Sequence, residues 1–331
     1  MERKNGKQGS TQMRNLPKIV VIVGPTASGK TALAIALAKK HSAMGGSSFG
    51  GNGIAGAEII SADSRQIYRG MDIGTGKAPR NNKRSKIYIS GGIAHHLIDI
   101  KNPDEDYSVA EYKRDAIRAI NDILKRGKLP ILVGGTGLYV KAVIDNLTIP
   151  EVKADPRLRK RLETQIQKEG LAVVAKKLVS LDPEAASMVD LKNPRRVVRA
   201  LEIALKTKQP LSASRKSGPP LYDAVQIGLY PGKEKLEKKI KKRTKEMFES
   251  GLVKEVKSLI EKYGSKCKAF DGIGYREIID YLDGKISLSE AEELINKNSV
   301  SYAKRQMTWF KKDKRIRWVK NPKEGITLRY F

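Results

Sequence analysis

The sequence predicts an α/β fold in which helices flank a parallel sheet, with a helical segment inserted. Three apolar segments end in turn residues and are separated by helical stretches: KIVVIVG, AEIISAD and PILVGG. This alternation is typical of parallel strands joined by crossover helices. From about Ile149 to Pro210 the strand pattern disappears, and helical segments begin at Asp, Asn and Pro residues. A strand pattern returns with AVQIGLY at 224–230, so we expect a sheet that is discontinuous in sequence.

A glycine-rich turn connects the first expected strand to an Ala- and Leu-rich helix. The turn, GPTASGKT, matches the pattern G-x-x-x-x-G-K-[ST] in the strand, turn and helix context that this pattern requires. In such a loop, backbone N–H groups, the helix N-terminus and a lysine attract phosphate, so the fold class is P-loop NTPase-like. The residues expected to bind a di- or triphosphate are Gly24, Pro25, Thr26, Ala27, Ser28, Gly29, Lys30 and Thr31. The hydroxyl of Thr31 is the expected ligand of Mg²⁺, which prefers hard oxygen ligands.

The chain divides into four expected parts. Residues 1–17 are a flexible basic tail, 18–148 the P-loop catalytic core, 149–212 a helical insertion domain, and 213–331 a return to the core followed by a basic helical region. The Gly/Ser-rich segment GGSSFGGNGIAG at 45–56 interrupts the core, and its six glycines predict a mobile loop with no chemical role.

The chain is strongly basic, with 65 Lys and Arg residues against 36 Asp and Glu residues and a net charge of +29. Such an excess favours a polyanionic partner, although lysine-rich compositions also occur without one. The one cysteine, Cys267, can form neither an internal disulfide nor a multi-cysteine metal site, which fits a reducing compartment. The sequence contains no apolar run of membrane-spanning length and no secretory signal. We therefore expect a cytoplasmic protein with no membrane partner.

A second group of polar residues follows the second expected strand. The segment SADSRQIYRGMDIGTGK places Asp63 at the carboxyl end of this strand, followed by Ser64, Arg65 and Gln66. An acid at this position is suited to act as a base or a metal ligand, although Asp and Ser also cap turns without any chemistry. Because ligands gather at the carboxyl ends of parallel strands, Asp63 should lie beside the phosphate loop. Lys77 is expected to add positive charge for a bound anion.

Three other segments carry polar residues with a structural interpretation. PILVGGTGLYVKA brings Thr136 to the same edge of the sheet, where its hydroxyl could orient a substrate or cap a helix. His95 and His96 are adjacent in an expected strand, so their side chains point to opposite faces, and we expect structural roles. DYSVAEYKRDA predicts a helix that begins at Ser108, with Glu111 completing a capping box.

The second half of the chain is the more basic and carries aromatic residues among its charges. KEKLEKKIKKRTKEMFESG holds eight basic residues between Lys233 and Lys245, which alone indicate only a solvated helix face. FDGIGYREI combines a glycine turn with Phe270 and Tyr275, side chains that can stack on bases. YAKRQMTWFKKDKRIRW interleaves Trp309 and other aromatic residues with basic ones. This mixture favours nucleic-acid binding more than charge alone does.

The chain resembles the tRNA dimethylallyltransferase family. The motifs GPTASGKT, SADSRQIYRGMDIGTGK, LVGGTGLYVKA, NPRRVVRALE, GIGYRE and AKRQMTWF occur in the order and approximate spacing of that family, from about residue 18 to 320. The P-loop is shared by many families, whereas DSRQ followed by GGTGLY and KRQMTWF is highly specific. Two departures, the 45–56 segment and Gly76 in place of the usual alanine, fall on no position with an assigned chemical role.

The resemblance implies transfer of a dimethylallyl group from its diphosphate to the exocyclic amine of the adenosine 3′-adjacent to the anticodon in tRNA. The P-loop and Mg²⁺ would then hold a departing pyrophosphate rather than ATP. The implied catalytic residues are Asp63 as the base, Thr136, which orients the amine, and Arg243 at the pyrophosphate. The expected partners of a monomeric enzyme are dimethylallyl diphosphate and the tRNA anticodon stem-loop. The positions that match tRNA-contacting segments are Asp63, Ser64, Arg65, Gln66, Thr136, Arg159, Arg195, Arg196, Val197, Val198, Arg199, Phe270, Asp271, Gly272, Ile273, Gly274 and Tyr275.

Other functions explain parts of the sequence. A P-loop kinase of a small molecule or nucleotide accounts for the phosphate loop and Asp63, but it leaves the basic aromatic segment near the C-terminus without a role. An isopentenyltransferase that acts on free adenine nucleotides would not need the tRNA-facing segments. An RNA-binding protein with a relic phosphate loop would not need Lys30, Thr31, Asp63 and Thr136 to be intact.

Overall fold

The computed structural model describes residues 16–43, 56–81, 85, 87–214 and 217–327. Nearly all of the expected tail at 1–17 and of the Gly/Ser-rich segment at 45–56 lies outside these ranges. The chain forms two compact units. One unit combines the residues up to Ile144 with those from Leu221 onward, and the other consists of Asp145–Pro220.

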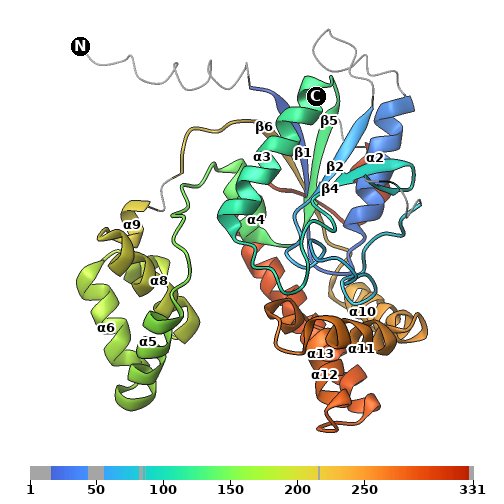
Figure 1. The fold of residues 1–331 in the computed structure, drawn as a ribbon. Coiled ribbons are helices and arrows are strands. Elements are labelled where there is room, and N and C mark those ends of the chain that lie inside the picture. Colours follow the sequence, from blue (N-terminus) through green and yellow to red (C-terminus); the bar gives the residue numbers. More distant parts are fainter. Residues whose placement is uncertain (1–15, 44–55, 82–84, 86, 215–216, 328–331) are drawn as a thin grey trace, which may run out of the picture. The chain divides into compact units, whose positions relative to one another are not determined.

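The larger unit is built on a sheet whose seven described strands lie in the order β3-β4-β2-β5-β1-β6-β7 (Figure 1). Neighbouring strands are parallel except β3 and β4, which form an antiparallel pair. The predicted fold class is confirmed, because the four expected strands are β1, β2, β5 and β6. The strands are β1 (Lys18–Val23), β2 (Ala57–Ser61), β3 (Tyr88–Ser90), β4 (Ile93–His96), β5 (Leu129–Gly134), β6 (Asp223–Leu229) and β7 (Arg317–Val319).

Helices cover both faces of the sheet because alternate residues of its central strands point to opposite sides. In β1, Ile19 and Val21 pack with α3 (Val109–Lys125) and α4 (Gly137–Ile144). Val20 and Ile22 pack on the other side, with α2 (Lys30–Ala43) and with Ile326 of α14 (Pro322–Thr327). Full burial of such side chains contributes about 1.5–3 kcal/mol each. The sheet is thus a rigid base for the loops at its ends.

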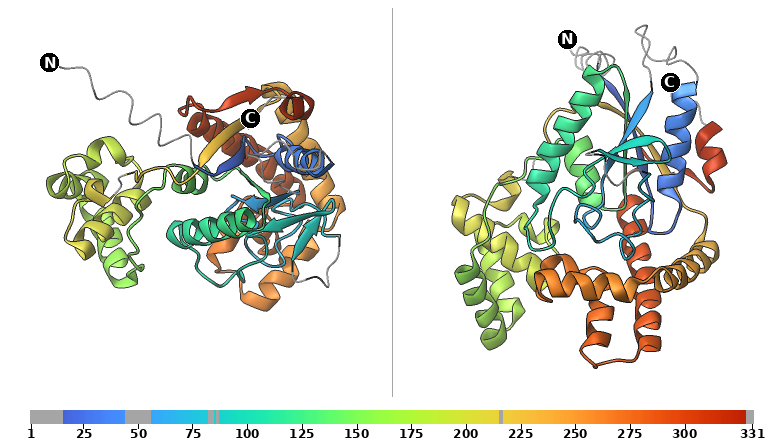
Figure 2. Two further views of the ribbon diagram at one scale, coloured as in Figure 1. Left: turned by 90° about the horizontal axis from the view of Figure 1, so that it is seen from above. Right: turned by 45° about the vertical axis from the view of Figure 1, so that its right-hand side comes forward.

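Four further helices gather at the carboxyl end of the sheet, where α10 to α13 lie together in both side views (Figures 1 and 2). They share a core with Ile67, Tyr68 and Met71, which follow β2. These helices are α10 (Lys233–Glu249), α11 (Leu252–Tyr263), α12 (Tyr275–Leu282) and α13 (Leu288–Phe310), with the short 3₁₀ helix η1 (Lys268–Asp271) before α12. None of the described helices has both the length and the apolar character that a bilayer crossing requires.

The smaller unit is helical in its described part. Two of its helices begin as the sequence predicts, with Asp155 and Asn193 as N-caps and proline at the next position. Val174, Leu178 and Val197 belong to its own apolar core. Its helices are α5 (Pro156–Glu169), α6 (Leu171–Leu181), α7 (Ala185–Met188), α8 (Pro194–Thr207) and α9 (Leu211–Ser214).

Candidate functional site

The phosphate loop follows β1 and has a backbone that requires glycine at both ends. Gly24 has φ +148° and Gly29 has φ +98°, and Ala27 between them also has a positive φ of 59°. A Cβ on Gly24 would lie 2.4 Å from the carbonyl oxygen of Leu229, so no side chain fits there. Among the described residues, the N–H groups of Gly29, Lys30 and Thr31 have no acceptor. These groups are therefore available to an anion at the start of α2.

One N–H group of the loop is already occupied. The N–H of Thr26 donates to Oε1 of Gln306 on α13 at 2.8 Å. This N–H is therefore paired within the protein, and diphosphate binding by Thr26 stays a prediction. Its side chain is also engaged, since Oγ1 accepts a hydrogen bond of 2.9 Å from Nη1 of Arg243.

Two buried cations face the loop. Lys30 Nζ donates to the carbonyl oxygen of Pro25 at 2.7 Å, and burial lowers the pKa of its amine from 10.5 to about 8, although Asp63 opposes the shift. Burial also lowers the pKa of Arg243, again against the effect of Asp63. Unlike exposed cations, these two groups have already lost most of their hydration. A bound anion would restore the interactions that the two cations lack.

Asp63 and Thr136 lie on neighbouring loops that hydrogen bonds hold together. Oδ1 of Asp63 accepts from the N–H of Arg65 at 2.8 Å and from that of Gln66 at 3.4 Å, so Asp63 does cap a turn. Oγ1 of Thr136 accepts from the N–H of Ser64 at 3.1 Å and donates to the Ser64 hydroxyl at 3.3 Å. The turn thus fixes the Asp63 carboxyl group at the carboxyl end of the sheet. Turn capping and a chemical role are compatible at this residue.

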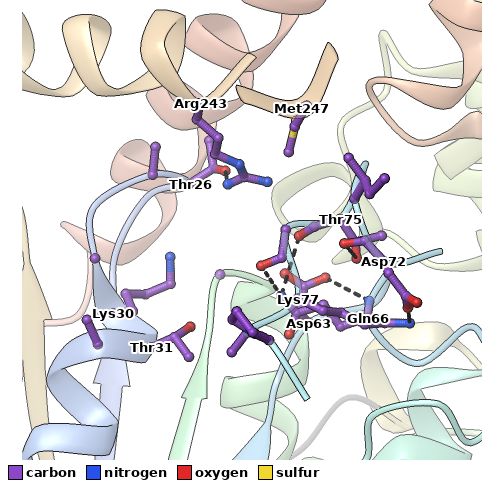
Figure 3. A pocket seen from close by; sticks show the side chains of 18 of the residues that line it. Thr26, Lys30, Thr31, Asp63, Gln66, Asp72, Thr75, Lys77, Arg243 and Met247 are labelled. Carbon is purple, nitrogen blue, oxygen red and sulfur yellow. Dashed lines mark hydrogen bonds and ion pairs between the residues drawn. The ribbon is translucent and has the colours of Figure 1, made fainter. Parts of the chain in front are cut away.

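Lys30, Asp63 and Arg243 line a cavity of about 1240 Å³ in the larger unit, whereas Thr136 is not among its lining residues. Figure 3 shows Lys30 and Thr31 on one side, Asp63 and Gln66 across from them, and Arg243 near Thr26. A smaller cavity of about 330 Å³ adjoins it and is lined by Arg65 and by residues 271–275. The residues that line both cavities are Thr26, Ala27, Asp63, Thr75, Arg243, Met247 and Tyr302. The predicted base and the predicted pyrophosphate ligand therefore lie where the two cavities meet.

Comparison with known proteins decides the family. The family profile described as IPP transferase matches residues 66–313, and that described as isopentenyl transferase matches residues 17–105. A tRNA dimethylallyltransferase from Acetivibrio thermocellus is 44% identical over 309 residues, which cover 92% of each chain. The chain belongs to the IPP transferase family. The resemblance inferred from the motifs is confirmed.

Solved structures of IPP transferases share this fold. A full-length tRNA isopentenylpyrophosphate transferase from Bacillus halodurans has a TM-score of 0.63 at 41% identity, covering 91% of this chain and 89% of that chain. A eukaryotic dimethylallyltransferase acting on tRNA has a TM-score of 0.69 at 29% identity, covering 89% and 70%. Membership of the family makes the protein a prenyl-transferring enzyme that uses a diphosphate substrate.

Gly76, which stands where the family usually has alanine, lies against the guanidinium group of Arg243. Gly76 has φ +60°, and a Cβ there would lie 2.7 Å from Nη2 of Arg243. The guanidinium group packs against the bare backbone, so this departure does bear on a predicted catalytic residue. Glu255 of α11 holds the loop at 72–76, because its carboxylate accepts from the N–H groups of Asp72, Ile73 and Gly74 at 2.7–3.1 Å.

Lys77 does not add positive charge for a ligand. Its amine is buried and forms ion pairs with Asp72 at 2.7 Å and with Asp99 at 2.5 Å. It also donates to the carbonyl oxygen of Tyr68. The expected role as a counter-charge is therefore wrong, because two carboxylates already neutralise this lysine.

The aromatic residues expected to stack on bases differ in exposure. Phe270 and Tyr275 are buried, and the Tyr275 hydroxyl donates to Glu255 at 2.7 Å, so stacking on a base is excluded in this conformation. Trp309 is 42% exposed, and its ring also packs against the backbone of Gly137, where a Cβ would lie 2.2 Å from it. The glycine-containing backbone at 272–274 lines the smaller cavity instead.

The predicted tRNA-contacting residues of the smaller unit differ in exposure. Arg195 and Arg196 are exposed at the start of α8, whereas Val197 and Val198 are buried in the core of that unit and cannot offer side chains to a ligand. Arg159 binds buried Glu202 through two hydrogen bonds of 2.8–2.9 Å, and Arg199 binds the same carboxylate. Burial alone would raise the Glu202 pKa, but these bonds lower it to about 2. Arg159 and Arg199 thus have a structural role in the smaller unit, because they pair with the buried carboxylate of Glu202.

The two histidines have protein partners. His96 Nε2 lies 2.7 Å from Oε2 of Glu58, and His95 Nδ1 lies 2.9 Å from the carbonyl oxygen of Ile93. Within the described part of the chain, no three His, Cys, Asp or Glu side chains form a group that could hold a metal ion. The predicted capping box of Ser108 and Glu111 is confirmed at the start of α3.

Gln306, Met247 and Tyr302 line the site but were not predicted from the sequence. Gln306 lies within the KRQMTWF motif, which the sequence interpretation assigned to nucleic-acid binding because of its neighbours. Met247 follows Arg243 by four residues, the spacing that places two side chains on the same face of a helix. That spacing is the one signal that could have indicated Met247.

Proposed function

We propose that the protein transfers a dimethylallyl group from dimethylallyl diphosphate to the exocyclic amine of the adenosine 3′-adjacent to the anticodon in tRNA. Family membership supports the reaction class. The observation that carries the proposal is the junction of the two cavities at Asp63 and Arg243. A diphosphate in the larger cavity and an adenine in the smaller cavity would meet at one carboxylate.

The larger cavity suits a departing pyrophosphate. As the bond between the allylic carbon and the diphosphate oxygen breaks, negative charge accumulates on the pyrophosphate. Lys30, Arg243 and the N–H groups at the start of α2 are positioned before the reaction to stabilise that charge. The hydroxyl oxygen of Thr31, which lines the same cavity, is the kind of ligand that Mg²⁺ prefers. Thr31 and the diphosphate would hold the ion, which supplies further positive charge when bound.

Asp63 is the proposed base. As the new C–N bond forms, the adenine amine becomes acidic and gives a proton to the carboxylate, which needs no raised pKa to accept it. Thr136, which is bonded to Ser64 beside Asp63 but lines neither cavity, is the proposed group that orients the amine. The products are the prenylated adenosine and pyrophosphate.

The smaller cavity is the proposed site of the adenine. A base must leave its stack to enter, at a cost of a few kcal/mol that is smallest in a loop, which favours the anticodon loop. We propose that Asp63–Gln66 and Phe270–Tyr275 contact the loop, the latter mainly through its backbone. Arg159, Arg195, Arg196 and Arg199 are proposed contacts of tRNA phosphates, where binding should weaken with salt. The monomeric state and the cytoplasmic location remain predictions.

Diphosphate binding should weaken as the pH rises through about 8. Lys30 carries its charge below its folded-state pKa of about 8 and loses it above that value. Calorimetric titration with inorganic pyrophosphate from pH 7 to 9.5 would measure the effect. Because pyrophosphate titrates as well, Lys30→Met is the matched control. The ratio of wild-type to Lys30→Met affinity should fall as the pH rises, and a constant ratio would contradict a charged Lys30 in the site.

The lowered pKa of Lys30 also affects the stability of the fold, which should increase with pH whereas diphosphate binding decreases. The folded-state pKa lies below the unfolded value, so between about pH 8 and 10.5 the unfolded chain binds more protons at this residue. Lys30 therefore makes the free energy of unfolding rise with pH in that window. Lys30→Met should lack this contribution in urea titrations at pH 7 and pH 9.

A transfer assay tests the proposed function against its alternatives. The protein is incubated with radiolabelled dimethylallyl diphosphate and either unmodified tRNA or AMP, and ATP hydrolysis is followed in parallel. Label should enter tRNA. Label in AMP alone would indicate an enzyme of free nucleotides, and tRNA-stimulated ATP turnover without prenylation would indicate phosphoryl chemistry. Either result would overturn the proposal.

A further inference from the structure

Gln306 is buried between the two loops that carry the proposed chemistry. It lies on α13 and is 6% exposed. Its Oε1 accepts from the N–H of Thr26 at 2.8 Å, and its Nε2 donates to the carbonyl oxygen of Gly135 at 2.8 Å. One side chain thus joins the phosphate loop to the loop between β5 and α4, using both ends of its amide.

The contact depends on the absence of a side chain at residue 135. A Cβ on Gly135 would lie 2.2 Å from Nε2 of Gln306, so only glycine allows the amide to reach the backbone. An amide can also accept at one end and donate at the other, which an ionised carboxylate of the same length cannot do. Glutamate would present a second acceptor to the Gly135 carbonyl, and leucine would leave the N–H of Thr26 and this carbonyl unpaired.

Each loop continues directly into a proposed functional group. Thr26 accepts a hydrogen bond from Arg243 through its hydroxyl. Gly135 precedes Thr136, whose hydroxyl pairs with Ser64 next to Asp63. A shift of either loop would therefore change the spacing between the cations at the diphosphate and the groups at the amine.

We propose that Gln306 is a positioning residue that sets the spacing between the phosphate loop and the loop carrying Thr136. It acts through Thr26 and Gly135, because both ends of its amide are already bonded to them. The statement that the phosphate loop binds the prenyl donor and that the Thr136 loop serves the acceptor adenosine rests on the proposed function. The role of Gln306 in the shape of the phosphate loop does not depend on the proposed function, and pyrophosphate binding tests that role separately.

The first test compares Gln306→Leu with Gln226→Leu. Gln226 on β6 is also buried and lines neither cavity, so the same chemical change is made away from the loops. Gln306→Leu should weaken inorganic pyrophosphate binding about tenfold, the effect of one lost buried hydrogen bond. It should also lower kcat by at least as much and leave the KM for tRNA within about twofold. Gln226→Leu should match the wild type in all three.

Three results would overturn the proposal. They are unchanged pyrophosphate affinity and kcat in Gln306→Leu, equal losses in Gln226→Leu, and a raised KM for tRNA as the only change, which would make Gln306 a tRNA contact. If the wild type transfers no prenyl group but Gln306→Leu still weakens pyrophosphate binding, the proposed function fails and the role in the loop stands.

A second variant gives a readout that a purely structural role would not produce. Gln306→Glu keeps the acceptor for Thr26 and regains a donor for Gly135 only when its carboxyl group is protonated. Its kcat relative to wild type should therefore recover as the pH is lowered. A ratio independent of pH would contradict the proposal, and this variant carries the test if Gln306→Leu does not fold.

Discussion

Asp63→Asn should lower kcat by about 100-fold or more, the range expected when a general base is removed. The amide oxygen of asparagine can still accept from the N–H groups of Arg65 and Gln66, so the turn that presents residue 63 should persist. What is lost is the group that takes the proton from the adenine amine. Single-turnover rates with saturating dimethylallyl diphosphate and tRNA would measure the effect.

The controls for Asp63→Asn separate chemistry from binding. The Kd for tRNA should stay within about twofold, since asparagine preserves the local hydrogen bonds. Asp104→Asn makes the same change on an exposed residue that lines neither cavity, and it should leave the rate unaltered. Loss of tRNA binding together with normal chemistry on a saturating anticodon stem-loop would contradict a role as base.

Lys30→Met should reduce kcat by about 100- to 1000-fold, the usual effect of removing one donor that stabilises developing negative charge. The same change should make the folded protein more stable at pH 7. The lowering of the Lys30 pKa from 10.5 to about 8 corresponds to about 3 kcal/mol, an upper limit for the gain because the bond to Pro25 is lost too. Kinetics and urea unfolding of the same preparation would measure both effects.

Lys77→Met is the matched control for stability. Lys77 is also a buried lysine, but two carboxylates pair with it, so its removal leaves Asp72 and Asp99 without their cation. The expected result is a loss of stability rather than a gain. Wild-type pyrophosphate affinity in Lys30→Met would contradict the assignment of Lys30 to the diphosphate.

Local sequence patterns were sufficient for the four neighbouring strands β2, β5, β1 and β6 and for the loops at their carboxyl ends. The apolar run before Gly24 is typical of a strand buried on both faces, and the loop after it needs the positive φ values that glycine permits. Asp63 and Thr136 were placed together because both follow parallel strands. Residues next to a strand end are thus predictable from short segments.

Residues whose roles depend on distant partners were assigned incorrectly or missed. Gln306 meets Thr26 across 280 positions of sequence, and no local pattern encodes that contact. Lys77 was expected to face a ligand, because its own segment shows neither that the lysine is buried nor that Asp99 pairs with it together with Asp72. Phe270 and Tyr275 were expected to face nucleic acid, since the packing of η1 and α12 against the residues after β2 is not visible in their own segment.

The most direct test of the proposed reaction is to locate the transferred group in the tRNA. Unmodified tRNA treated with the protein, dimethylallyl diphosphate and Mg²⁺ is cut to fragments and analysed by tandem mass spectrometry. We predict that one dimethylallyl group replaces one hydrogen on the base of the adenosine 3′-adjacent to the anticodon, and that Asp63→Asn gives almost no such product. Unmodified tRNA under these conditions, or a prenyl group on a different nucleotide, would contradict the proposed function.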